Sequence, residues 1–211
     1  PRWVKLQQRL DAQIGPLGQA AMQRTGIKPG ECILDVGCGC GQTSLELAER
    51  VGSQGFIVGV DISQPMLARA QERQQELKLT HLNFIQADAQ TYAFAQERFD
   101  LVFSRFGVMF FIDPVQAFTN IRGALRRNGR LTFVCWQAQD KNEWAQIPLN
   151  AALQYVQPPT PAAPGAPGPF AFADPQRVRH SLESAGFKDV TLESYEAQLS
   201  MGGAVNVEEA A

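Results

Sequence analysis

The sequence predicts an α/β protein with a doubly wound, mostly parallel sheet and helices on both of its faces. Two observations support this prediction. Short apolar runs alternate along the chain with longer segments of helical periodicity. In addition, the apolar run 31–36 leads through a glycine-rich turn directly into a helical segment at 42–51, which is the pattern of a ligand-binding strand–turn–helix junction.

Length and composition limit the classes of function. The 211 residues are 45% hydrophobic and 19% charged, so we expect a globular protein with a single domain over residues 1–211. The net charge of −2 gives no electrostatic reason to expect a nucleic-acid partner. We expect no membrane span, because no apolar stretch approaches the necessary length. The first residue is Pro1 rather than Met, so we do not expect it to be the native start.

Neither the N-terminus nor the cysteines indicate export or a metal centre. The first residues lack the pattern of a signal peptide, and we therefore expect a cytoplasmic protein. No second cysteine pair or histidine cluster completes a tetrahedral site, so we expect reduced cysteines and no metal. The four cysteines are Cys32, Cys38, Cys40 and Cys135.

The spacing of the glycines in the first turn indicates the kind of ligand. Gly37, Gly39 and Gly41 form G-x-G-x-G, whereas a dinucleotide fold has G-x-G-x-x-G and a P-loop has a lysine after its last glycine. Asp35 stands just before the turn, where a carboxylate would repel a phosphate and attract a cation. The pattern favours a nucleoside with positive charge, and the alternative is a glycine turn that binds nothing.

The stretch 32–44 resembles motif I of the class I S-adenosylmethionine-dependent methyltransferases. The resemblance implies a Rossmann-like sheet of order 3-2-1-4-5-(7)-6, with S-adenosylmethionine as cofactor and S-adenosylhomocysteine as product. It also implies that Asp35 lies near the methionine moiety and that the turn passes beside the cofactor. The implied cofactor residues of this stretch are Asp35, Gly37, Cys38, Gly39, Gly41 and Thr43.

A second acid follows the predicted strand 56–60. Asp61 at the tip of a strand can accept hydrogen bonds from two ribose hydroxyls, and the stretch resembles motif II of the same family. Ile62 and Met66 join the predicted cofactor site. The alternative for Asp61 is the N-cap of the helix that runs to about residue 77.

A third acid follows the predicted strand 83–86. Asp88 can accept a hydrogen bond from an adenine amino group, and the Ala87-Asp88-Ala89 stretch resembles the adenine-binding motif III. A turn-forming aspartate is the alternative. The next predicted strand, 99–104, is apolar enough for the middle of a sheet and ends at Ser104, which we include in the cofactor site.

The remaining elements complete the predicted fold. The N-terminal segment 1–24 is a helical cover, interrupted at Gly15-Pro16, that either closes one edge of the sheet or folds over the cofactor. We expect a helix at 114–126 and a strand at 130–136. A helix capped by Asp174 then leads to a sixth strand at 187–193. No terminal antiparallel strand is visible after it, so either the chain is truncated or the sheet has one strand fewer.

Residues 137–173 interrupt the strand–helix alternation. An amphipathic helix begins near Trp144, and a proline-rich stretch follows it. We predict a lid-like insertion over the acceptor site, with a surface linker as the alternative. The predicted acceptor-site residues are Arg105, Phe106, Phe110, Phe111, Trp136 and Trp144. Arg105 either pairs with an anionic acceptor group or ties down its loop, and each aromatic ring is otherwise a core residue.

These patterns predict a methyltransferase acting on a small, flat or lipophilic acceptor, similar to the ubiquinone and menaquinone biosynthesis enzymes. In-line methyl transfer depends on proximity and orientation, and we identify no catalytic base, because His81 and His180 are both poorly placed. One alternative is a non-catalytic S-adenosylmethionine-binding module that works through a partner. A nucleotide-dependent oxidoreductase is the other, although Gln42 counts against it. The sequence does not indicate the oligomeric state.

Overall fold

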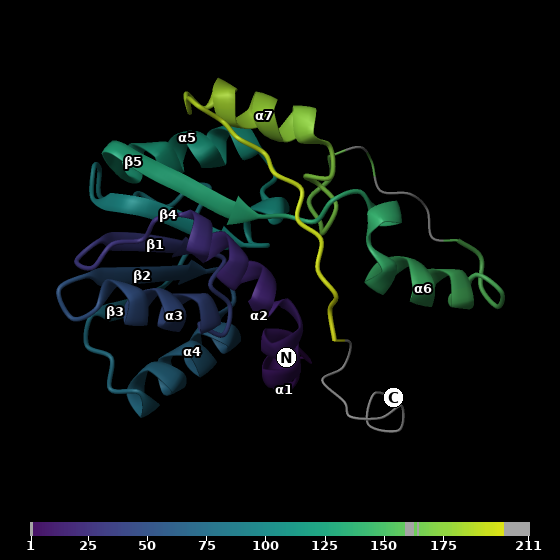
Figure 1. Ribbon diagram of the computed structural model, residues 1–211, viewed down its shortest axis with the longest axis horizontal. Helices are drawn as coiled ribbons and strands as arrows, with labels where there is room; N and C mark the ends of the chain where they lie inside the picture. Colours follow the sequence, from purple (N-terminus) through teal and green to yellow (C-terminus); the bar gives the residue numbers. More distant parts are fainter. Residues whose placement is uncertain (1, 159–162, 164, 201–211) are drawn as a thin grey trace.

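The computed structural model describes residues 2–158, 163 and 165–200, and its centre is a five-stranded sheet (Figure 1). The strands are β1 (Cys32–Val36), β2 (Phe56–Asp61), β3 (Leu82–Gln86), β4 (Phe99–Arg105) and β5 (Leu125–Val134). Their order is β3-β2-β1-β4-β5, and every neighbouring pair is parallel. The predicted parallel α/β fold is therefore confirmed.

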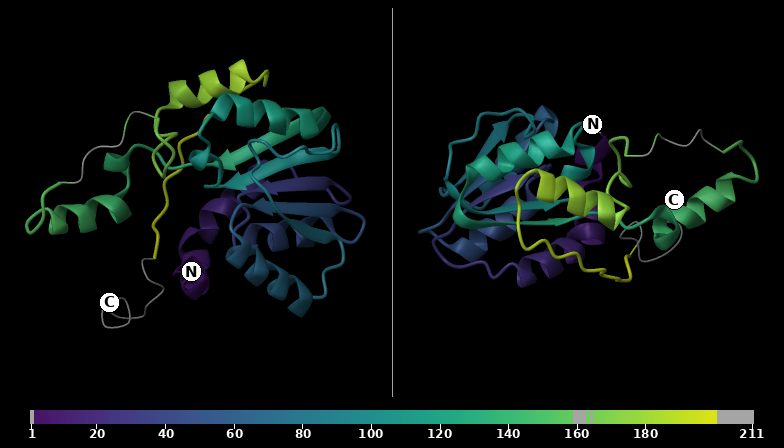
Figure 2. Two further views of the ribbon diagram at one scale, coloured as in Figure 1. Left: turned by 180° about the vertical axis from the view of Figure 1, so that it is seen from behind. Right: turned by 90° about the horizontal axis from the view of Figure 1, so that it is seen from above.

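Helices cover both faces of the sheet (Figure 2). They are α1 (Arg2–Lys5), α2 (Gln7–Arg24), α3 (Gln42–Val51), α4 (Gln64–Glu76), α5 (Pro114–Ala124), α6 (Glu143–Ala152) and α7 (Pro175–Ser184), with short 3-10 helices at η1 (Val108–Phe110) and η2 (Gln139–Lys141). Side chains alternate along each strand, so Ile33 and Ile57 join a core with α3 and α4, whereas Leu34 and Val58 join a core with α5 and α7. The sheet is doubly wound for this reason.

Strand β5 begins earlier in the sequence than predicted. Helix α5 ends at Ala124 and β5 starts at Leu125, so the predicted helix end near 126 and strand start at 130 are wrong. Leu125 pairs with Phe99 of β4, and Arg126 forms an ion pair with Asp100 at 2.8 Å. Between Leu125 and Arg130 the register with β4 is shifted, and the continuous pairing with β4 runs from Arg130 to Val134.

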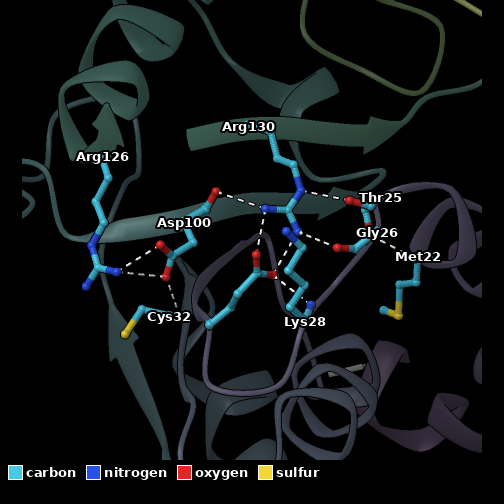
Figure 3. A network of polar contacts seen from close by, with 9 residues as sticks. Met22, Thr25, Gly26, Lys28, Cys32, Asp100, Arg126 and Arg130 are labelled. Atoms are coloured by element: carbon cyan, nitrogen blue, oxygen red, sulfur yellow. Dashed lines mark hydrogen bonds and ion pairs between the residues drawn. The ribbon is translucent and has the colours of Figure 1, made fainter. Parts of the chain in front are cut away.

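Arg130 of β5 fixes the connection that leads into β1 (Figure 3). Its Nε donates to the carbonyl of Thr25 at 2.7 Å, and its Nη2 donates to Glu31 Oε2 at 2.7 Å. Asp100 accepts from the backbone N–H of Cys32 at 2.8 Å. β5 and β4 thereby position the start of β1, and with it the glycine turn.

The predicted interruption of the N-terminal helix at Gly15-Pro16 is wrong. Helix α2 runs without a break from Gln7 through Pro16 to Arg24. Pro16 removes one hydrogen bond of the helix, but Gly15 lacks the Cβ that a proline ring normally hinders in the preceding residue. The break in the N-terminal segment lies instead between α1 and α2, at Leu6.

The predicted sixth strand at 187–193 is also wrong, because residues 187–200 contain no strand. Phe187 packs edge-on against Phe118 of α5, with ring centroids 6.4 Å apart, and Val190 and Leu199 also pack against the core without forming a strand. Among the described residues, β5 therefore pairs only with β4. Residues 201–211, where a terminal strand was sought, lie outside the described part of the chain.

The insertion projects from the body of the protein. Helix α6 points away from the sheet (Figures 1 and 2), none of its residues is fully buried, and Ile147 is 65% exposed. Asp174 caps α7 as predicted, accepting from the N–H of Gln176 at 2.9 Å. Part of the proline-rich stretch, residues 159–162 and 164, lies outside the described residues.

Candidate functional site

The three predicted acids lie at one edge of the sheet but differ in depth. Val36 is in register with Val60 and Asp61 with Gln86, so the carboxyl ends of β1, β2 and β3 meet there. Asp35 is one residue inside β1 and completely buried. Asp61 is half-buried, and Asp88 is exposed. A ligand along this edge would run from the interior to the surface.

Asp35 has one satisfied and one unsatisfied carboxylate oxygen beside the glycine turn. Its Oδ2 accepts from the hydroxyls of Thr43 at 2.5 Å and Ser44 at 2.6 Å, at the start of α3. Its Oδ1 is buried and has no hydrogen-bond partner among the residues that the structure describes. Burial raises the pKa of this carboxyl from 3.8 to about 6 although the two hydroxyls oppose the change. The free oxygen can accept a hydrogen bond from a cationic group.

The amide groups of the turn are already used within the protein. Gly37 and Cys38 donate to the carbonyl of Val60 at 2.8 and 3.1 Å, and Gly39 donates to Asp61 Oδ2 at 2.9 Å. A pyrophosphate would need free amides here and would face two carboxylates. The arrangement disfavours a dinucleotide and fits a cationic nucleoside.

Glycine is required at the turn for space as well as for conformation. Gly37 has φ +71°, and a Cβ there would lie 2.6 Å from the Cα of Gly107. A Cβ on Gly39 (φ +54°) would lie 2.8 Å from Met66 Cε. Cys38 is buried, with its side chain in the core under α3 and α4. The turn is thus pressed between Gly107, which follows β4, and Met66 of α4.

The residues after β2 and β3 form the outer part of the site. Asp61 Oδ1 accepts from the N–H of Ser63 at 2.8 Å, so this carboxylate connects the glycine turn with the start of α4. Ile62 beside it is 70% exposed, an apolar surface open to a ligand. Asp88 Oδ1 accepts from Gln90 N–H at 2.9 Å, so the turn-forming interaction is present. Its predicted adenine contact, with the half-buried Ala87 and the buried Ala89, stays a prediction.

Ser104 lies beneath the site. It is fully buried, its hydroxyl donates to the carbonyl of Val36 at 2.7 Å, and it accepts from the N–H of Gly107 at 3.2 Å. These bonds join the ends of β1 and β4. Ser104 therefore shapes the turn, and its predicted direct contact with the cofactor stays a prediction.

A cleft of about 1160 Å³ opens beside the carboxyl end of β5, and three of the predicted acceptor residues line it. Phe106 stacks on Trp136 with ring centroids 4.2 Å apart, and Trp136 contacts Trp144 at 4.9 Å. Phe170 of the insertion stacks on Trp144 at 6.1 Å and extends the row. The other walls come from α2 and from residues 191–199.

The cleft and the turn are separate but adjacent. None of the three acids lines the cleft. Phe106, which does, directly precedes the Gly107 that presses on Gly37, and its φ of +63° is unusual for a residue with a side chain. A strained aromatic residue at the junction of the two spaces indicates a functional position.

Three predicted acceptor residues, Arg105, Phe110 and Phe111, do not line the cleft. Arg105 Nη1 donates to Gln42 Oε1, and its Nη2 lies 3.7 Å from Asp11 Oδ1, so Arg105 ties its loop to α2 and α3. Phe110 is 56% exposed outside the cleft. Phe111 is a core residue, edge-on to Phe118 with ring centroids 5.8 Å apart.

Asp11 and its partner Arg73 were missed by the sequence reasoning. Asp11 Oδ2 accepts from Arg73 Nη1 at 3.1 Å, and the same Nη1 donates to the carbonyl of Cys40 in the turn at 2.8 Å. A signal was present, because Asp11, Gly15 and Gly18 share one face of a helix, and small residues at that spacing indicate close packing.

The histidines stay outside the site. His81 precedes β3, and its Nε2 lies 3.0 Å from the carbonyl of Ala48, while His180 is on the exposed side of α7. In the described part of the chain, no three His, Cys, Asp or Glu side chains gather as a metal site. None of the helices described is both long and apolar enough to cross a membrane.

The sequence matches the methyltransferase-domain family over residues 27–197. The chain belongs to this family. It is 35% identical over 118 residues to aklanonic acid methyltransferase DauC of a Streptomyces species, covering 56% of this chain and 54% of that protein. It is 29% identical over 137 residues to demethylmenaquinone methyltransferase of Listeria welshimeri, covering 65% and 58%. The chain thus spans somewhat more than half the length of these relatives.

The fold has counterparts among solved structures. A methyltransferase from Aquifex aeolicus, described as SAM-dependent, superimposes with a TM-score of 0.63 at 20% identity, covering 84% of this chain and 81% of that one. This likeness concerns the fold alone. Together with the family match over residues 27–197, it confirms the predicted class I methyltransferase fold.

Proposed function

We propose that this protein is an S-adenosylmethionine-dependent methyltransferase with a planar, quinone-type small molecule as acceptor. The observation that carries the proposal is the buried Oδ1 of Asp35, for which the described part of the chain supplies no hydrogen-bond partner. A buried carboxylate oxygen without a donor destabilises the fold, and a cationic ligand group would remove that effect. S-adenosylmethionine bears an ammonium group and a sulfonium.

We assign the three acids to successive parts of the cofactor according to how deeply each acid is buried. Asp35 holds the ammonium group and Asp61 the ribose hydroxyls. Asp88 and Ala89 hold the adenine, against the exposed side of Ile62. One property of the turn supports this orientation: the amides of Gly37, Cys38 and Gly39 are engaged with Val60 and Asp61 and are not available to a phosphate.

When bound, S-adenosylmethionine supplies an activated methyl group. The protein then has to align the acceptor and exclude water, because the transfer is an in-line displacement. Phe106, Trp136 and Trp144 form a row of packed rings that lines the cleft, and a planar acceptor would stack on an outer face of this row. The names of the two relatives, which refer to aklanonic acid and demethylmenaquinone, support an acceptor of this type.

Binding and turnover test the proposal in two steps. Calorimetry should show binding of S-adenosylhomocysteine and none of NADH. The purified protein should then transfer a labelled methyl group from S-adenosylmethionine to reduced 1,4-naphthoquinone, and Trp136→Ala should impair this transfer. Binding without transfer to any quinol would overturn the enzymatic proposal in favour of a binding module. Binding of NADH alone would overturn the cofactor assignment.

A further inference from the structure

An ion-pair cluster joins three elements beside the glycine turn. Asp11 of α2 lies between Arg73 of α4, at 3.1 Å, and Arg105 of β4, at 3.7 Å. The three side chains are only 16%, 18% and 11% exposed. Gln7, one helical turn before Asp11, donates a further hydrogen bond to its Oδ2. One carboxylate therefore forms ion pairs with two largely buried guanidinium groups, and Asp35 and Glu46 act on Arg105 from farther away.

Both arginines also form hydrogen bonds to the glycine turn or to the first residue after it. Arg73 Nη1 contacts Asp11 and the carbonyl of Cys40 together, and thereby connects α2 with the turn through one atom. Arg105 Nη1 donates to Gln42, the first residue of α3. The turn is thus held at its middle and at its end by cations that share Asp11.

Helix α2 lies directly on these side chains. A Cβ on Gly15 would come 2.9 Å from Gln42 Nε2, and a Cβ on Gly18 would come 2.9 Å from Arg105 Cδ. The same helix supplies Leu17, Ala20 and Ala21 to the cleft. Helix α2 therefore packs on Gln42 and Arg105 beside the glycine turn and also forms a wall of the cleft.

We propose that Asp11 is a positioning residue for the cofactor site. By holding Arg73 against the Cys40 carbonyl, it fixes the conformation in which the turn accepts S-adenosylmethionine. Without this charge, Arg73 and Arg105 repel each other in a site of low exposure, and Arg73 leaves the turn. The inference rests on the proposed cofactor, and it assigns to α2 a role beyond covering the sheet.

The test compares Asp11→Asn with Glu72→Gln. The control also removes a carboxylate from an arginine, since Glu72 pairs with Arg69 at 3.0 Å, but Glu72 is 61% exposed. Asp11→Asn should weaken S-adenosylhomocysteine binding about tenfold, the effect of losing one charged hydrogen bond, and the control should not. The KM for S-adenosylmethionine should rise similarly, with kcat at saturation changed by less than about twofold.

A double-mutant cycle makes the test specific. If Asp11 acts through Arg73, then Arg73→Gln should weaken binding by itself, and adding Asp11→Asn should weaken it little further. Additive losses, or an Asp11→Asn variant with lower melting temperature but unchanged affinity, would overturn the proposal. Should Asp11→Asn not fold, Arg73→Gln with wild-type affinity would overturn it too. Absence of binding by the wild-type protein would instead overturn the proposed cofactor.

Discussion

Asp35→Asn removes the buried charge beside the glycine turn and keeps the size of the side chain. The rise of the Asp35 pKa from 3.8 to about 6 corresponds to about 3 kcal/mol by which its ionisation opposes folding. Because the folded pKa lies above the unfolded one, the stability that Asp35 contributes is full below about pH 3.8 and lost above about pH 6. The ligand-free variant should therefore gain about 3 kcal/mol over the wild-type protein across that window.

Cofactor binding should show the opposite trend. In the wild-type protein, affinity for S-adenosylhomocysteine should rise between pH 4 and pH 6, by up to about tenfold per pH unit, as Asp35 ionises. The variant should bind weakly and without this dependence. Urea unfolding and calorimetry at pH 4 to 8 measure both quantities. Parallel stability profiles for the two proteins, together with undiminished binding by the variant, would refute the assignment of Asp35.

Three further substitutions test neighbouring parts of the site. Asp61→Ala should weaken S-adenosylhomocysteine binding by about 1.5–3 kcal/mol in calorimetry, and unchanged affinity would remove its ribose role. Gly107→Ala should lower the free energy of unfolding by about 1–3 kcal/mol in urea, because the new Cβ would lie 2.6 Å from the Val36 carbonyl. Gly107 has an ordinary φ of −78°, so backbone strain would not contribute to the loss. An unchanged free energy of unfolding would show that the close contact with Val36 is absent. His81→Ala should leave kcat unchanged, and a large loss would mean that the site is misplaced.

Much of the site was predictable because it is local. The strand, glycine turn and helix between residues 32 and 51 are contiguous, and their apolar pattern and glycine spacing specify both the elements and the character of the ligand. Asp61 and Asp88 follow predicted strands, and parallel strands bring such positions to one edge whatever the rest of the chain does.

The tertiary structure decided what depends on partners distant in sequence. Leu125 pairs with Phe99 and Arg126 forms an ion pair with Asp100, so β5 begins before Arg130, while residues 187–193 pack on the core through Phe187 and form no strand. The role of Arg105 was undetermined until Asp11, 94 positions away, proved to be its partner. Local propensity determines strands and turns, but an ion pair between distant elements depends on how the whole chain packs, and no short stretch of sequence contains that information.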